Sequence, residues 1–174
     1  MAQLPIIVAP DPRLKRTAEP VARVDDALRQ LADDLLETMY AAPGIGLAAP
    51  QVGQLLRLIV VDVAPRNGPR DPHVLFNPEV LWVSEEDSTA SEGCLSLPEH
   101  YADVVRPRAV KAAYLDRAGE RRILEAEGLL ATCVQHEIDH LEGVLFVDHI
   151  SALKRNMILR KLVKAKKQGA FETV

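Results

Sequence analysis

Apolar residues recur every three or four positions in residues 25–40, which is the spacing of one face of an amphipathic helix. Asp25 or Asp26 can cap the start of this helix, and the Pro-Gly pair at 43–44 can end it. We therefore expect a helix whose buried face carries Leu28, Leu31, Leu35 and Met39.

Extended segments dominate the middle of the chain. Residues 56–63 are mostly Leu, Ile and Val and read as a buried strand, and residues 73–83 read as a strand that is interrupted at Pro78. Residues 103–127 look like a β-hairpin, because apolar extended runs flank a turn signal at 116–119. The pattern thus predicts antiparallel pairing between neighbouring segments.

Two more helices are expected in the second half of the chain. One contains residues 128–142 and ends at Gly143, and the other spans roughly residues 151–168. Strands that flank a central helix, with no repeat and no linker, indicate an α+β fold. We expect mostly antiparallel sheets around the central helix and a C-terminal helix, in one domain over residues 1–174.

The composition is that of a soluble globular protein, with 48% hydrophobic and 26% charged residues. The N-terminus lacks a basic stretch followed by an apolar run, so we expect no signal peptide. No apolar run approaches the ~20 residues that span a bilayer.

The two cysteines, Cys94 and Cys133, are too few for a disulfide scaffold and fit a reducing compartment. We therefore expect a cytoplasmic protein with no membrane partner.

The predicted central helix carries the pattern His-Glu-Ile-Asp-His at 136–140. Residues four apart on an α-helix lie within about 40° of each other, so His136 and His140 share one face and can bind one metal ion. Glu137 lies at the edge of that face, where it can approach a bound water without being a ligand. A surface helix with two unrelated histidines is less favoured, because the chain has only five. The central helix is thus predicted to bind metal.

A hydrolytic metal site usually has three protein ligands, so a third is needed. In one zinc-protease pattern the third ligand is a histidine, at the position that Phe146 occupies here. Another pattern takes a glutamate from a later helix, but no acidic residue occurs between Asp148 and Glu172. Cys94 is the best upstream candidate, because thiolates bind zinc and iron well, although a free cysteine is often a small buried hydrophobe. Cys133 competes, but it would put three ligands in a row along the helix rather than around a tetrahedron.

Three motifs follow one another along the chain: G-I-G-L-A-A-P-Q at 44–51, E-G-C-L-S at 92–96 and H-E-I-D-H at 136–140. They resemble the three motifs of the peptide deformylase family in order and spacing. The resemblance covers almost the whole chain. The predicted C-terminal helix is similar to the one that bacterial members of the family have. The family resemblance implies removal of the formyl group from the N-terminal N-formylmethionine of newly synthesised polypeptides, with release of formate.

The resemblance implies one divalent metal ion bound by Cys94, His136 and His140. Fe²⁺ is the expected metal in the cell, and Zn²⁺, Ni²⁺ or Co²⁺ could replace it in purified protein, since the ligand set excludes none of them. Metal identity is therefore open at this point.

The resemblance also assigns catalytic roles. Glu137 would take a proton from water in the fourth metal position and hand it to the leaving amine. The side-chain amide of Gln51 and the backbone N–H of Leu95 would donate hydrogen bonds to the oxyanion of the tetrahedral intermediate. Gln51 could instead cap local backbone.

The methionine side chain of the substrate requires an apolar pocket beside the metal. Thr132 is polar, so we expect it at the rim of this pocket. The expected substrate-binding residues are Ile45, Gly46, Gly93, Leu129, Thr132 and Cys133.

Three polar residues are expected around the ligands. Glu92 would hold the cysteine loop by pairing with Arg106, and Asp139 would orient a ligand or cap the helix locally. We treat the remaining histidines as ordinary surface or hydrogen-bonded residues, namely His73, His100 and His149.

Two other functions compete with this interpretation. A zinc endopeptidase would need a third ligand at Phe146 or downstream, where none occurs. A non-catalytic metal-binding or ribosome-associated module would need neither Glu137 nor Gln51. Formate release from formyl-Met-Ala-Ser separates the three.

The last predicted helix is strongly basic. Residues 151–168 carry seven Lys or Arg and no acid, whereas the rest of the chain carries 14 basic and 25 acidic residues. A polyanionic partner accounts for this distribution, and a packed helix with a solvated basic face is the alternative. The resemblance favours docking of this helix on the ribosome near the exit tunnel, where the nascent N-formylmethionyl peptide emerges.

Overall fold

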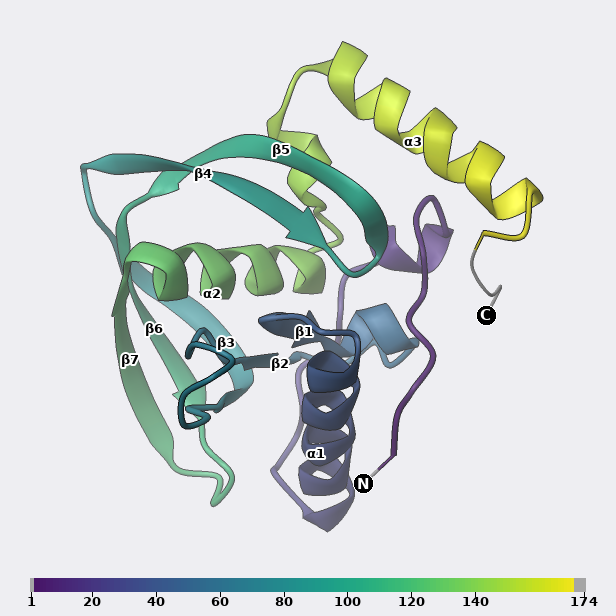
Figure 1. Ribbon diagram of the computed structural model, residues 1–174. Coiled ribbons are helices and arrows are strands. Elements are labelled where there is room, and N and C mark those ends of the chain that lie inside the picture. Colours follow the sequence, from purple (N-terminus) through teal and green to yellow (C-terminus); the bar gives the residue numbers. More distant parts are fainter. Residues whose placement is uncertain (1, 171–174) are drawn as a thin grey trace.

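The computed structural model describes residues 2–170, which form helices around two antiparallel sheets (Figure 1). The larger sheet has the strand order β1-β2-β3-β6-β7, and the smaller sheet pairs β4 with β5. This architecture confirms the predicted α+β fold. The strands are β1 (Gly46–Ala48), β2 (Leu58–Val61), β3 (His73–Val83), β4 (Asp87–Cys94), β5 (Leu97–Pro107), β6 (Ala109–Leu115) and β7 (Arg121–Glu127). The α-helices are α1 (Asp26–Ala41), α2 (Gly128–Leu141) and α3 (Ala152–Lys167).

The central helix, α2, lies between the β4–β5 hairpin and the larger sheet (Figure 1). It starts at Gly128, with a φ of 62°, and stops before Gly143, with a φ of 72°, where the left-handed backbone suits glycine. One side of α2 buries Val134 and Leu141 against Ile59 of the larger sheet. The other side is left to face the hairpin.

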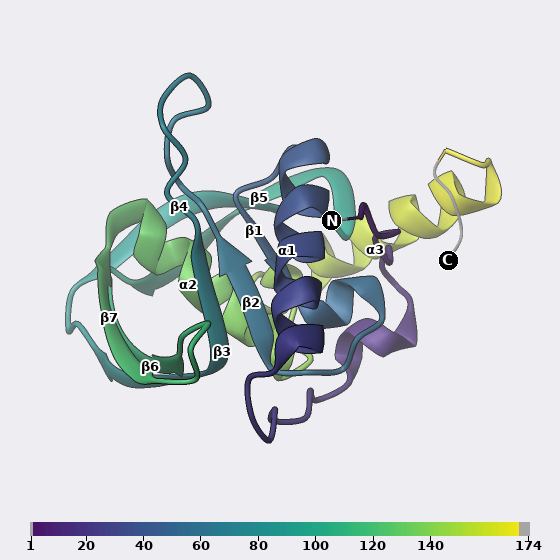
Figure 2. The same cartoon turned by 90° about the horizontal axis from the view of Figure 1, so that it is seen from below.

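The predicted first helix, α1, packs its apolar face on the larger sheet (Figure 2). Asp25 caps it by accepting a hydrogen bond from the Leu28 N–H. Leu35 and Met39 are fully buried in the cluster that also contains Phe76. The spacing of apolar residues thus predicted both the helix and its buried face.

The hairpin predicted over residues 103–127 is wrong in its first part. β6 and β7 do pair around the turn at 116–119, but residues 103–107 belong to β5 and pair with β4 in the other sheet. β4 is mostly polar, so residues 87–93 carry no apolar alternation that would mark a strand. The pairing of β5 with its neighbour β4, which no apolar pattern marks, decides this part of the fold.

The predicted interruption at Pro78 is a bulge within a continuous β3. The register with β6 shifts between Phe76 and Glu79, and Asn77 has a φ of 48°. The bulge accommodates the proline, which has no N–H for the ladder. The Asn77 side chain hydrogen-bonds the backbone of Val21 in both directions, which holds this conformation.

α3 lies on the outside of the molecule (Figure 2). Within the described part of α3 only Leu162 is fully buried, and Ile158 packs beside it on a core cluster that includes Phe146. None of the helices in residues 2–170 has the length and apolar character that crossing a membrane needs.

Candidate active site

Three side chains from two elements converge on one point. His136 and His140 lie on α2 and are buried, and Cys94 ends β4. Their ligand atoms all lie within 4.8 Å of one another, and Cys94 Sγ is 3.3 Å from His140 Nε2. Two ligands of a tetrahedral zinc ion lie about 3.5 Å apart for bonds of 2.0–2.3 Å. The donor set and its spacing therefore fit one divalent transition metal.

The orientation of His136 is held by Glu92. Its Nδ1 is 2.9 Å from Glu92 Oε1, and because a carboxylate only accepts, Nδ1 carries the proton of the neutral ring, whose Nε2 then has a lone pair for a metal. Burial alone raises the pKa of Glu92, but hydrogen bonds from His136 and Arg106 lower that pKa to about 2. Glu92 therefore stays ionised and keeps Nε2 of the histidine free for a metal.

The ion pair expected between Glu92 and Arg106 is present and buried. Arg106 donates from Nε to Glu92 Oε2 at 2.7 Å and from Nη2 to Oε1 at 2.9 Å. Its Nη1 donates to Asp139 Oδ2 at 2.8 Å, and His149 Nε2 lies 2.8 Å from the same oxygen. Asp139 thus contacts Arg106 and His149 rather than a ligand histidine, and among the described residues its link to His136 runs through Arg106 and Glu92.

Glu137 faces the cluster without belonging to it. Its Oε2 is 4.0 Å from His136 Nε2, and its Oε1 is buried without a hydrogen-bond partner in the described residues. Burial raises the pKa of the Glu137 carboxyl to about 7, although nearby His136 opposes the shift. A carboxylate in that range can both accept and release a proton near neutral pH.

Gln51 performs the local capping role and also faces the site. It lies in the 3-10 helix Ala49–Val52, where its Oε1 accepts from the Ala48 N–H at 2.9 Å. Its Nε2 then lies 3.0 Å from Ser96 Oγ and 3.5 Å from Cys94 Sγ. The capping contact therefore fixes the amide with its donor group beside Cys94.

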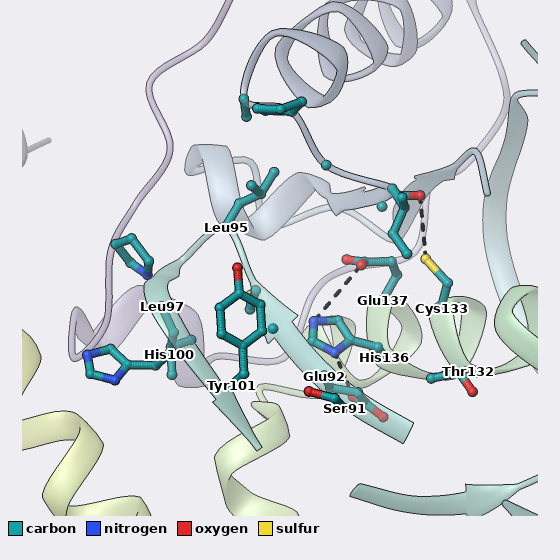
Figure 3. Close-up of a pocket in the computed structure, with 18 of the residues that line it drawn as sticks. Ser91, Glu92, Leu95, Leu97, His100, Tyr101, Thr132, Cys133, His136 and Glu137 are labelled. Carbon is teal, nitrogen blue, oxygen red and sulfur yellow. Dashed lines mark hydrogen bonds and ion pairs between the residues drawn. The ribbon is translucent and has the colours of Figure 1, made fainter. Parts of the chain in front are cut away.

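A pocket of about 730 Å³ opens beside this cluster (Figure 3). All six expected substrate-binding residues line it, as does Leu95 from the turn between β4 and β5. Ile45 and Leu129 are 43% and 55% exposed and form apolar parts of the mouth. Thr132, expected at the rim, is instead buried.

Cys133 lines the pocket but lies outside the metal-ligand cluster in the described residues. Burial raises the pKa of its thiol well above the usual value, and the nearby Glu137 carboxylate adds to the shift. The thiol therefore stays protonated, and its Sγ donates to the Ile45 carbonyl oxygen at 3.5 Å.

Several pocket residues carried no signal in the sequence. His100 and Tyr101 of β5 line the pocket, so His100 is more than the ordinary surface residue it was expected to be. Arg66 reaches the pocket from the loop after β2. Strand pairing brings His100 and Tyr101 to the pocket, and the path of the loop after β2 brings Arg66. No local sequence motif predicts either.

Gly46→Ala tests the close packing at the pocket floor. A Cβ at Gly46 would lie 2.5 Å from Glu137 Oε2 and 2.7 Å from Cys133 Sγ, so the Glu137 carboxylate must move. Because a displacement near 1 Å can cost about 100-fold, we expect kcat/KM for a formyl-peptide to fall about 10- to 100-fold. Steady-state kinetics measure this. Gly68→Ala is the matched control, since a Cβ there meets nothing closer than 3.5 Å; an equal loss in both variants would contradict the prediction.

Comparisons with known proteins agree on one family. A sequence model described as polypeptide deformylase matches residues 3–156. A relative named peptide deformylase from Methylocella silvestris is 60% identical over 171 residues, which cover 97% of this chain and 87% of that protein. A crystal structure of peptide deformylase from Ehrlichia chaffeensis matches with a TM-score of 0.92 at 37% identity, over 98% of this chain and 100% of that one. Another structure from that organism, in complex with actinonin, matches with a TM-score of 0.90 at 41% identity, over 95% and 98% of the two chains.

Proposed function

We propose, since the chain belongs to the peptide deformylase family, that Cys94, His136 and His140 hold the metal ion of its reaction. The chain is a metal-dependent hydrolase that removes the formyl group from the N-terminal N-formylmethionine of newly synthesised polypeptides and releases formate. The observation that carries the residue assignment is the convergence of these three ligand atoms within 4.8 Å.

The donor set supports a first-row divalent metal, and we propose Fe²⁺ in the cell. One thiolate and two imidazoles suit iron and zinc alike. Such an ion supplies Lewis acidity, which polarises a carbonyl oxygen and makes water a better nucleophile at neutral pH. Metal analysis of protein purified without oxygen tests the choice, and zinc as the main metal in that preparation would contradict it.

Glu137 is proposed to move the proton. Its carboxylate takes a proton from the water that attacks the formyl carbon, and hands it to the nitrogen as the C–N bond breaks. The products are formate and a polypeptide with a free amine. The Oε1 of Glu137 supports this role, because it is buried without a hydrogen-bond partner in residues 2–170 and so leaves one carboxylate oxygen for water.

Gln51 and the backbone N–H of Leu95 are proposed to stabilise the oxyanion. The Gln51 amide is held by the Ala48 N–H, so its Nε2 is already oriented beside Cys94 before substrate arrives. One such preorganised donor can be worth about 3 kcal/mol of barrier.

The pocket beside the ligands is proposed to take the methionine side chain. Leu129, Thr132 and Cys133 of α2 line it, and Ile45 and Gly46 line it from β1 and the residue before it. Its volume of about 730 Å³ lies within the range of small-ligand sites and leaves room for more than one side chain.

Release of formate from formyl-Met-Ala-Ser tests the function. We expect turnover that requires the metal and is inhibited by actinonin, the ligand of a similar structure. Cleavage of internal peptide bonds without formate release would contradict the proposal and favour an endopeptidase.

We also propose that the enzyme acts in the cytoplasm and docks on the ribosome through α3. Residues 151–168 carry seven basic and no acidic side chains. Most of these basic side chains are exposed, including Arg160, Lys164 and Lys167. A cationic, solvated helix face supports binding to the phosphates of ribosomal RNA, which would weaken with salt.

Deletion of residues 152–174 tests this docking. We expect the truncated protein to lose co-sedimentation with ribosomes at low salt and to keep hydrolysis of formyl-Met-Ala-Ser within about threefold, because α3 contributes only Leu162 to the fully buried core within the described chain. If the truncated protein still pellets with ribosomes, α3 is not the docking element.

A further inference from the structure

A second groove begins where the active-site pocket ends. It has a volume of about 310 Å³ and lies between β5 and α3, with Tyr101, Asp103, Lys154, Met157, Ile158 and Lys161 among its walls. Tyr101 lines both the pocket and this groove, which we call the β5–α3 groove. The two hollows therefore meet at one side chain.

Tyr101 is the shared wall. Its ring lies against Gly93 of β4, where an added Cβ would come 2.5 Å from Tyr101 Cε1. The residue is 70% exposed although it is aromatic, so a large part of its surface has no partner in the described chain. Figure 3 shows the ring among the pocket residues, beside His100 of the same strand. A peptide leaving the pocket across Gly93 would meet this ring first.

The groove is locally cationic over an apolar floor. Lys154 and Lys161 are exposed and seven positions apart, so they share one face of α3. Within residues 2–170 neither ammonium group has an ion-pair partner, although Asp103 lies on the opposite wall. Met157 and Ile158 supply apolar surface between the two lysines.

We propose that the β5–α3 groove binds the substrate polypeptide downstream of its N-formylmethionine and favours acidic residues there. This proposal rests on the proposed function, because it extends the substrate site. Strands lie about 4.8 Å apart and an extended chain rises about 3.3 Å per residue, so crossing from β4 past β5 takes about three residues. With the methionine in the pocket and two residues at its mouth, roughly the fourth to sixth residues reach the lysines.

The overall charge of the enzyme works against this preference. The chain has a formal net charge of -4, so its average field repels an acidic peptide. A preference for acidic substrates must therefore come from a local cationic feature. The net charge of the enzyme alone would produce a preference for basic peptides.

The test compares three C-terminally amidated hexapeptides that share formyl-Met-Ala-Ser and continue with Glu-Glu-Ala, Gln-Gln-Ala or Lys-Lys-Ala. At low salt we expect kcat/KM to fall in that order, with about a 3- to 10-fold difference between the acidic and basic peptides, as exposed ion pairs allow. The difference should disappear in 0.5 M NaCl, because exposed charge pairs are screened.

Two double variants with equal charge change separate the groove from the rest of α3. In K154E/K161E the order of the peptides should reverse, whereas R160E/K167E, on another face of the helix, should keep the wild-type order. Both should hydrolyse formyl-Met-Ala-Ser like the wild type and keep their helical circular dichroism.

Several results would overturn the groove proposal. Equal kcat/KM for the three peptides would do so, as would an order that survives K154E/K161E or changes equally in the control. Loss of ribosome binding in K154E/K161E without a change in peptide preference would assign the lysines to RNA instead. Failure of the wild type to release formate from the tripeptide would instead count against the proposed function.

Discussion

Glu137→Ala is expected to lower kcat for formyl-Met-Ala-Ser by about 10³-fold or more while the protein keeps its metal. Proton transfer by a positioned carboxylate contributes about 10²- to 10⁴-fold, and Glu137 is the pocket carboxylate with a buried oxygen that has no hydrogen-bond partner among the described residues. The metal should stay because Glu137 lies 4.0 Å from the nearest His136 nitrogen and outside the cluster of ligand atoms. Formate release and metal content, measured on the same preparation, check both halves.

Glu137→Gln is the matched control, because it keeps the shape of the side chain and removes the basic oxygen. We expect the same retention of metal and nearly the same loss of turnover. A glutamine variant with wild-type activity would exclude proton transfer as the role of Glu137. Loss of metal from the alanine variant would show that Glu137 is a ligand.

Cys94→Ala and Cys133→Ala are expected to behave in opposite ways toward the metal. Cys94 Sγ lies 3.3 Å from His140 Nε2 in the ligand cluster, so its removal leaves two histidines and should abolish stoichiometric metal binding and activity. Cys133 holds a protonated thiol bonded to the Ile45 carbonyl, so its removal should keep the metal and change which side chain is preferred in the pocket.

Metal content after dialysis and kcat/KM for formyl-Met, formyl-Nle and formyl-Phe peptides measure the two effects. The two variants control for each other, since each removes one sulfur from the same region. Metal loss from Cys133→Ala with retention in Cys94→Ala would mean that the ligand assignment is reversed.

The helices and the motif residues were predictable because their information is local. His136 and His140 share a helix face at any position in a fold, since four residues nearly complete one turn. The apolar spacing in α1 likewise determines its buried face. These statements depend on the backbone period and on ligand chemistry alone.

The resemblance to the family predicted the complete set of metal ligands, which local sequence patterns could not. From the sequence alone, Cys94 and Cys133 both remained candidate metal ligands. Helix geometry disfavoured Cys133 but did not show where Cys94 lies relative to the histidines. The structure brings Cys94 to α2 by ending β4 beside it, 46 positions of chain away from His140. That contact depends on how β4 pairs with β5, which the polar sequence of β4 did not indicate.

The sequence by itself determined the chemistry: a two-histidine helix with a glutamate, a cysteine to complete it, and a basic final helix. Only the tertiary structure decided that residues 103–107 belong to β5 and pair with β4, a pairing that also brings Tyr101 to the pocket and to α3. It also decided that Asp139 holds Arg106 rather than a ligand. The physical reason is that periodicity and ligand preference are properties of one element, whereas strand pairing and buried ion pairs join different elements, as the bond between Arg106 and Asp139 does across 33 positions.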